Sequence, residues 1–235
     1  MKRHHSPRGG FLMPGIFACL SIGGPALAAD DIPKGTLTVD RTYVRVGVKS
    51  QLGWQITYPT ISVFTVNPDG TIIPSKSLRM RVRVLGVSFQ SGSTLLPLQG
   101  SWSKNNSSWT NYFYGTGPTV VPTNILVDTS VSANDQIKFR GRGAANAAGT
   151  SWYSYHQTGV TDPYVVVLKN GDTPPNYAPA YSQGNILSFL APYIDSTGKI
   201  KIGSQDLIIL MEASNATPGS TYFDMQDLVT LVTFE

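Results

Sequence analysis

The chain has 235 residues, 41% of them hydrophobic, with one cysteine and a formal net charge of +4. A chain of this length buries about 70% of the surface that it exposes when unfolded, so its core can hold it without disulfides. Three of its 18 basic residues precede every acidic residue, so the excess positive charge belongs largely to the N-terminal segment. The rest of the chain is nearly neutral, which does not support a general nucleic-acid binder.

Residues 1–28 have the pattern of a secretory signal peptide. Three basic residues precede an apolar stretch, and Ala26-Leu27-Ala28 matches the small-x-small cleavage site. We expect cleavage after Ala28 and export of a cysteine-free chain to the periplasm, the cell surface or the medium. That chain carries 15 basic and 14 acidic residues, and no later segment approaches the ~20 apolar residues that span a bilayer. An alternative is cleavage before Cys19, which would then carry a lipid.

Short runs of alternating apolar and polar residues follow, each bounded by turn-forming residues, as is typical of half-buried strands. Within "GWQIT", Trp54 and Ile56 alternate with polar residues, as in an inward-facing strand of an immunoglobulin-like sheet. The sequences "NPDG" and "DSTG" indicate hairpin turns. The predicted strands lie in residues 35–40, 43–48, 52–59, 78–89, 136–143 and 199–203.

Three later runs, 164–168, 206–211 and 228–232, are almost continuously apolar and indicate strands covered on both faces. Residues 185–194 have a helical apolar stripe that could cover one face, with Asn185 as cap and Pro192 limiting the length. We therefore predict a mostly β protein, an antiparallel β-sandwich of immunoglobulin-like architecture by analogy, with one short helix near the C-terminal part. Residues 29–235 form one domain, and 170–185 is the best candidate for an internal boundary.

Three segments, "VRVGVKSQLGWQITYP", "LKNGDTPP" and "MQDLVTLVTF", resemble a group of uncharacterised secreted bacterial β-rich proteins that have no assigned activity. The resemblance implies export and a β-rich fold and nothing further.

Two strands carry rows of cations. Arg79, Arg81 and Arg83 alternate with apolar residues, and a second row alternates likewise in "IKFRGRG". In one interpretation these are solvated faces whose long side chains cover apolar surface. In the other, the two rows lie side by side and bind an acidic glycan or a cell-envelope component such as lipopolysaccharide phosphate, because adjacent like charges repel unless an anion neutralises them. The second row consists of Lys138, Arg140 and Arg142.

Aromatic residues with polar neighbours offer a further binding surface. Such side chains stack against sugar rings, although in a β protein they more commonly fill the core or pair across strands. Trp109, Tyr112, Trp152 and Tyr155 are the candidate ligand-binding residues of this group, which also includes Trp102, Phe113, Tyr114 and Tyr153.

No catalytic or metal-binding pattern stands out. His156 is the sole histidine after cleavage, without a Gly-x-Ser-x-Gly elbow, and neither a zinc set nor a phosphate loop is present. Glu212 follows an apolar run and could act as an acid with Asp224 or Asp227, but a strand end entering solvent and a turn are the plainer interpretations. We expect no catalytic residue, no metal and no cofactor.

The predicted function is an exported, non-catalytic structural or binding module. A carbohydrate-active protein, either a glycan binder or a hydrolase, is the first alternative. The second is a subunit of a surface assembly that self-associates through an exposed strand, because the C-terminal "LVTLVTFE" resembles the terminal strand of chaperone-assembled pilus subunits. The chain departs from that family because it has no disulfide pair and no glycine at the usual distance before Phe234.

Overall fold

The computed structural model describes residues 34–39, 52–57, 62–178, 181 and 183–235. The predicted signal peptide, its cleavage site, Cys19 and the strand expected at 43–48 lie outside these residues. The chain divides into two compact units, 1–59 and 60–235. The candidate boundary at 170–185 falls within the second unit, in the connection between a strand and the helix.

The first unit contains a two-stranded antiparallel ribbon. β1 (Lys34–Val39) pairs with β2 (Leu52–Thr57), with Leu37 opposite Trp54. The prediction that "GWQIT" is an inward-facing strand of the sandwich is therefore wrong, because in the described part of the chain β2 pairs only with β1. The alternation of Trp54 and Ile56 indicated a strand correctly but carried no information on its partner.

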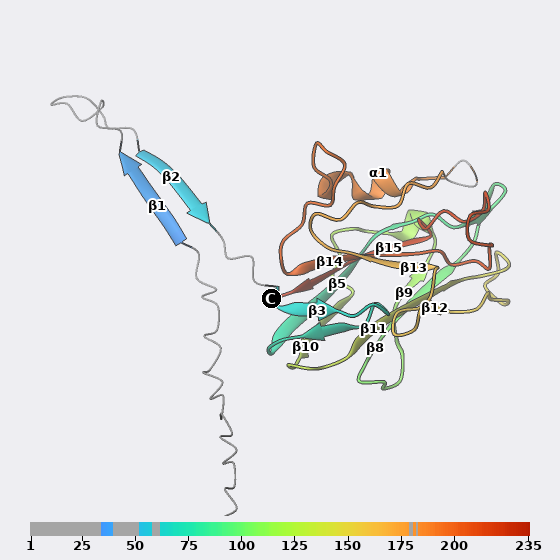
Figure 1. Ribbon diagram of the computed structural model, residues 1–235. Coiled ribbons are helices and arrows are strands. Elements are labelled where there is room, and N and C mark those ends of the chain that lie inside the picture. The colour runs from blue at the N-terminus through green and yellow to red at the C-terminus, as the bar shows by residue number, and fades with distance from the viewer. Residues whose placement is uncertain (1–33, 40–51, 58–61, 179–180, 182) are drawn as a thin grey trace, which may run out of the picture. The chain divides into compact units, whose positions relative to one another are not determined.

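The second unit consists of two antiparallel sheets that pack together, as predicted (Figure 1). The five-stranded sheet has the order β10 (Val127–Val131), β5 (Leu78–Val87), β15 (Leu228–Phe234), β14 (Asp206–Met211) and β13 (Val165–Leu168). The six-stranded sheet has the order β3 (Phe64–Val66), β4 (Ile72–Pro74), β11 (Ile137–Gly143), β8 (Leu98–Lys104) and β9 (Thr110–Gly115), and β12 (His156–Gln157) pairs with β11. A small ribbon of β6 (Gln90–Ser91) and β7 (Thr94–Leu95) follows β5.

The main core lies between the two sheets and is built by alternation along the strands. Met80 and Val82 of β5 point into it, as do Ile137 and Phe139 of β11 from the opposite sheet. Because successive side chains of a strand point to opposite faces, the cations between these residues point outward. The alternation predicted for 78–89 and 136–143 is confirmed.

A second cluster covers the outer face of the five-stranded sheet. α1 (Ile186–Leu190) lies beside this sheet (Figure 1). Its Ile186 and Leu190 belong to one buried cluster with apolar residues of β14 and β15. Asn185 caps the helix by accepting a hydrogen bond from the Ser188 backbone N–H at 2.8 Å. The short 3₁₀ helices η2 (Gly117–Thr119) and η3 (Ala191–Tyr193) complete the helical segments, and Pro192 lies in the first turn of η3. Double coverage explains the continuous apolar runs of β14 and β15.

Paired glycines allow the sheets to approach closely. Gly100 of β8 and Gly141 of β11 are directly opposite each other. A Cβ atom at Gly100 would lie 2.7 Å from Cζ of Tyr112, and one at Gly141 would lie 2.9 Å from Sδ of Met211. The missing side chains therefore make room for a tyrosine ring and a methionine between the sheets.

The two predicted turns are present, but one predicted strand is not. Asn67–Gly70 joins β3 to β4, and the Gly198 N–H donates to the Asp195 carbonyl in the second turn. Residues 199–203 form an isolated bridge at Ile200 instead of a strand. Ile200 is buried under α1, but its N–H donates to the Asp172 carbonyl in an irregular segment, so apolar alternation arose here without a sheet.

Candidate functional site

The first arginine row lies on the outer face of the five-stranded sheet, where carboxylates meet it. The Arg79 guanidinium donates to Asp128 on the neighbouring strand β10, and Arg81 pairs with the Glu235 carboxylate at 2.7 Å. The hydrogen bond and the charge of Arg79 hold the pKa of Asp128 below its usual range. Arg83 continues the row and is partly buried. Carboxylates of the same protein therefore neutralise Arg79 and Arg81.

The second row lies on the outer face of the six-stranded sheet, where aromatic rings meet it. The Arg140 guanidinium lies 4.4 Å from the ring centroid of Trp109 and 3.7 Å from that of Tyr155. Arg142 lies 4.3 Å from Tyr155 and 4.6 Å from Trp152. The five side chains form a ladder in which cations and rings alternate, an arrangement that stabilises each guanidinium by cation–π attraction. Lys138, the third cation of the row, donates to the Asn106 side chain instead.

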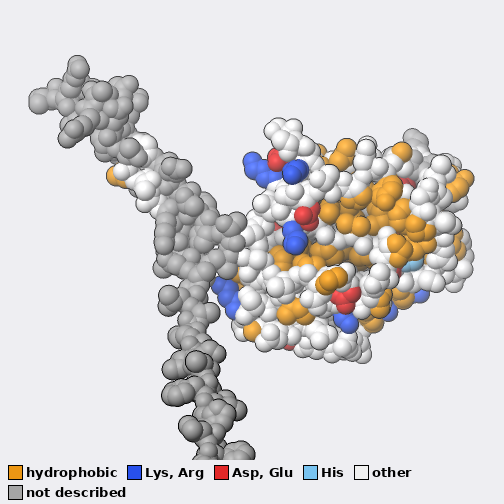
Figure 2. Space-filling model, in the orientation of Figure 1, with side chains coloured by type: hydrophobic (Ala, Val, Ile, Leu, Met, Phe, Trp, Pro, Cys, Tyr) orange, Lys and Arg blue, Asp and Glu red, His pale blue; other side chains and the backbone are white. Residues whose placement is uncertain are grey.

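The two rows therefore do not form one cationic surface. They lie on different sheets, each on the side opposite the shared core, so the sandwich separates them. On the face shown in Figure 2, blue and red side chains occur singly or together, without a large area of one sign. The reason for expecting an anion site, the mutual repulsion of six adjacent cations, does not apply to this arrangement.

The four candidate aromatic residues do not form one surface either. Trp109, Trp152 and Tyr155 belong to the ladder, whereas Tyr112 is 8% exposed and lies between the sheets. Its hydroxyl hydrogen-bonds to Thr230 Oγ1 at 3.0 Å, which places Tyr112 apart from the ladder. The pairing of β8 with β9 shifts register here and leaves Tyr112 without an opposite residue, so Tyr112 and the adjacent Phe113 both lie in the core.

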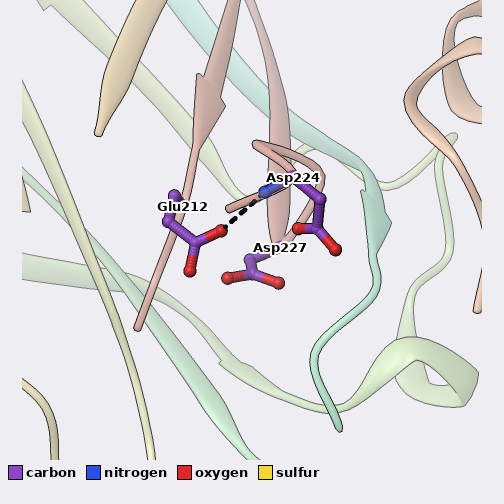
Figure 3. Close-up of side chains that lie close together, drawn as sticks. All are labelled: Glu212, Asp224 and Asp227. Atoms are coloured by element: carbon purple, nitrogen blue, oxygen red, sulfur yellow. Dashed lines mark hydrogen bonds between the residues drawn. The ribbon is translucent and has the colours of Figure 1, made fainter. Parts of the chain in front are cut away.

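Three carboxylates gather at the ends of β14 and β15. These strands are antiparallel neighbours, with Met211 opposite Leu228, so Glu212 directly after one strand meets Asp227 directly before the other. Asp224 joins them from the same connection, and one oxygen of each carboxylate lies within 4.8 Å of the others (Figure 3). The three side chains are 1–3% exposed. The interpretation of Glu212 as a strand end entering solvent is therefore wrong.

Backbone and side-chain donors hold two of these carboxylates. Glu212 accepts hydrogen bonds from the N–H and hydroxyl of Ser214 on one oxygen, and from the Asp224 N–H at 3.1 Å on the other. Asp227 accepts from the Ala213 N–H at 2.7 Å. Both oxygens of Glu212 are thus occupied by donors of the protein itself.

Two glutamine side chains hold the third carboxylate. The amide nitrogens of Gln183 and Gln226 each donate to Oδ2 of Asp224 at 2.9 Å. The oxygen of each amide is buried without a hydrogen-bond partner within the described part of the chain. The nitrogen of each amide must face Asp224, because an amide oxygen in its place would repel the carboxylate. The two amide oxygens are therefore hydrogen-bond acceptors that point away from Oδ2 of Asp224.

Burial and neighbouring charge oppose ionisation of Asp227. Loss of hydration, reinforced by the charges of Glu212 and Asp224, raises the pKa of Asp227 well above its ordinary value. Two unit charges 4 Å apart repel by about 4 kcal/mol at the effective dielectric constant near a protein surface. The charged form of Asp227 is therefore disfavoured unless a cation offsets the neighbouring charges.

The carboxylates border a cavity of about 320 Å³. Its described lining residues include no lysine, arginine or histidine. Tyr222, at the rim, is 57% exposed, and its ring centroid lies 6.0 Å from that of Tyr181. The lining consists of Phe89, Gln90, Ser91, Leu96, Tyr153, Tyr181, Gln183, Glu212, Ser214, Asn215, Ala216, Tyr222, Asp224 and Asp227.

His156 lies near this cavity without forming a catalytic triad. Its Nε2–H donates to the backbone carbonyl of Ser214 at 2.9 Å, and Nδ1 lies 3.3 Å from the Asp162 carboxylate. The ring is 9% exposed and stacks on Tyr164 at 3.9 Å. Since Nε2 carries the hydrogen of that bond, it cannot take a proton from the Ser214 hydroxyl.

Comparison of the chain with protein-family models, curated proteins and solved structures finds no match. In the described residues, no helix has the length and apolar character needed to cross a bilayer. Sequence reasoning named Glu212, Asp224 and Asp227 but missed the cavity. Its other walls include Phe89, Leu96, Tyr153, Tyr181 and Gln183. The available signal was the position of acidic residues at facing ends of two predicted strands.

Proposed function

We propose that the protein is an exported, non-catalytic binding module whose ligand is a neutral glycan bound in the carboxylate cavity. The observation that carries the proposal is the combination of three tyrosines with three carboxylates around one cavity. Aromatic rings stack on the apolar faces of sugars, and carboxylates accept hydrogen bonds from sugar hydroxyls. At about 320 Å³ the cavity is at the lower end of the size range of small-ligand sites.

The charge of the cavity supports a neutral ligand. Carboxylates repel uronic acids, sulfates and phosphates, and the described lining residues provide no cation to offset that repulsion. The arginines lie outside the cavity and interact with other groups: Arg79 with Asp128, Arg81 with Glu235, and Arg140 with the aromatic ladder. An acidic glycan or envelope phosphate is therefore the less favoured ligand.

The hydrogen bonds of Glu212 and Asp224 support a binding role over hydrolysis. A general acid must present its proton to the substrate within hydrogen-bond reach. Both oxygens of Glu212 accept bonds from the protein, and Asp224 receives two amide donors. A surface assembly built through the C-terminal strand has less support, because β15 is paired on both sides, with β5 and β14.

A glycan array followed by isothermal titration calorimetry tests the proposal. We expect neutral oligosaccharides to bind, Tyr222→Ala to weaken binding at least about tenfold, and Tyr114→Ala to leave it unchanged; a tenfold loss corresponds to about 1.4 kcal/mol. Tyr114 is the matched control because it is 61% exposed and lies outside the cavity. Exclusive binding of acidic glycans would contradict the proposed ligand, and release of reducing sugars would contradict the non-catalytic assignment.

Export is tested separately by the mass of the secreted protein. We expect an N-terminus at Ala29. A lipid-modified N-terminus at Cys19 would place the protein on a membrane and contradict the predicted processing.

A further inference from the structure

We propose that Glu212, Asp224 and Asp227, together with the amide oxygens of Gln183 and Gln226, bind a calcium ion. This inference is independent of whether a glycan occupies the neighbouring cavity. It assigns the buried acidic cluster a ligand of its own.

The first argument is charge. Three carboxylates that are 1–3% exposed approach within 4.8 Å, and the described residues around the cavity include no lysine, arginine or histidine. Buried charges are normally paired or coordinate a metal, because isolation from water is costly. A divalent cation would offset two of the three negative charges at once.

The second argument is the pair of free amide oxygens, which does not depend on the acidic residues. Gln226 is 0% exposed, its amide contacts Asp224 through the nitrogen, and its oxygen has no hydrogen-bond partner among the described residues. Gln183 is bound to Asp224 in the same way, and the described part of the chain offers no donor to its oxygen either. Buried acceptors in folded proteins are nearly always satisfied, so two orphan oxygens beside one carboxylate indicate a missing positive partner.

The third argument is the type and spacing of the donors. All five are oxygen atoms of carboxylates or amides, the ligands of calcium and magnesium, whereas zinc sites include histidine or cysteine beside any carboxylate. Ligands at 2.3–2.6 Å around calcium lie at most about 5.2 Å apart, and those around magnesium at most about 4.2 Å. The carboxylate oxygens, within 4.8 Å of one another, fit the larger ion.

A bound calcium ion would also fasten the connection between β14 and β15. Glu212 begins this connection, and Asp224 and Asp227 end it. The ion would therefore hold together the two ends of a segment that also lines the cavity, through Ser214, Asn215 and Tyr222.

Calorimetric titration of the full secreted chain with calcium chloride, after treatment with EDTA, tests the site. We expect one ion per chain with a dissociation constant of about 10⁻⁴–10⁻³ M, as in extracellular calcium modules, and weaker binding of magnesium. Asp227→Asn should weaken calcium binding at least about tenfold, whereas Asp195→Asn should not change it. Asp195 is the matched control because its carboxylate also accepts several hydrogen bonds but lies in a turn outside the cluster.

Terbium luminescence on the wild-type protein provides a readout that needs no variant. We expect excitation of the cavity tyrosines to sensitise bound terbium, and calcium to displace it. Absence of calcium binding up to about 10 mM, ten times the weak end of the expected range, would overturn the site. Equal loss of binding in Asp227→Asn and Asp195→Asn would also overturn it.

Discussion

The hydrogen bond between Tyr112 and Thr230 joins the two sheets through the core, and its removal tests how they are held together. Tyr112 lies on β9 and Thr230 on β15, their hydroxyl oxygens are 3.0 Å apart, and Thr230 is 1% exposed. Burial raises the pKa of Tyr112, so the phenol is neutral and the bond is one between two hydroxyls. Tyr112→Phe removes one partner without changing the ring, whose centroid lies 6.1 Å from that of Phe139.

The expected cost of Tyr112→Phe is about 1–2 kcal/mol, because the buried Thr230 hydroxyl is left without its partner. For a unit of this size, that corresponds to a fall in Tm of roughly 2–8 °C. Thr230→Val should cost a similar amount, but the double variant should cost less than the sum, with a coupling energy of about 1 kcal/mol.

Urea denaturation of the two single variants and the double variant measures these free energies. Tyr114→Phe is the control and should change stability by less than about 0.5 kcal/mol, because that side chain is 61% exposed. Strictly additive effects, or a cost below about 0.5 kcal/mol for Tyr112→Phe, would refute the reasoning that this bond couples the sheets.

Three further predictions concern single positions. Gly86→Ala should cost about 1–3 kcal/mol in urea denaturation, because its Cβ would lie 2.4 Å from the Phe189 ring; adding Phe189→Ala should remove the clash, and an unaffected single variant would contradict this. Asn185→Ala should cost about 1 kcal/mol in the same assay through loss of the α1 cap, whereas Asn185→Asp should retain most of the stability. Because Asp128 has a lowered pKa when folded, its stabilising contribution is present above its unfolded pKa of about 3.9 and is lost as pH falls through the folded value. Arg79→Ala should raise the Asp128 pKa in an NMR titration, and an unchanged value would refute the assigned cause.

Local sequence pattern was sufficient to predict four of the five strands of the five-stranded sheet, but in the six-stranded sheet it predicted β11 alone. Apolar alternation in 78–89 and 136–143 identified β5 and β11, and continuous apolar runs identified β14 and β15, because side-chain period and burial are properties of each strand alone. The same reasoning failed at 199–203, where alternation reflects packing under α1, and at Trp54, whose strand pairs outside the two sheets. Strand partners depend on contacts that a single segment does not specify.

The sequence by itself determined that Arg79, Arg81 and Arg83 share a face, that Arg140 and Arg142 share another, and that Glu212 ends an apolar strand. Only the tertiary structure decided which groups meet these residues. It put the two cation rows on opposite sides of the sandwich and brought Glu212 to Asp227, because β14 and β15 are antiparallel neighbours. The physical reason is that the side-chain period sets a residue's face locally, whereas its neighbours across the sheet, and hence its charge environment, are set by strand order.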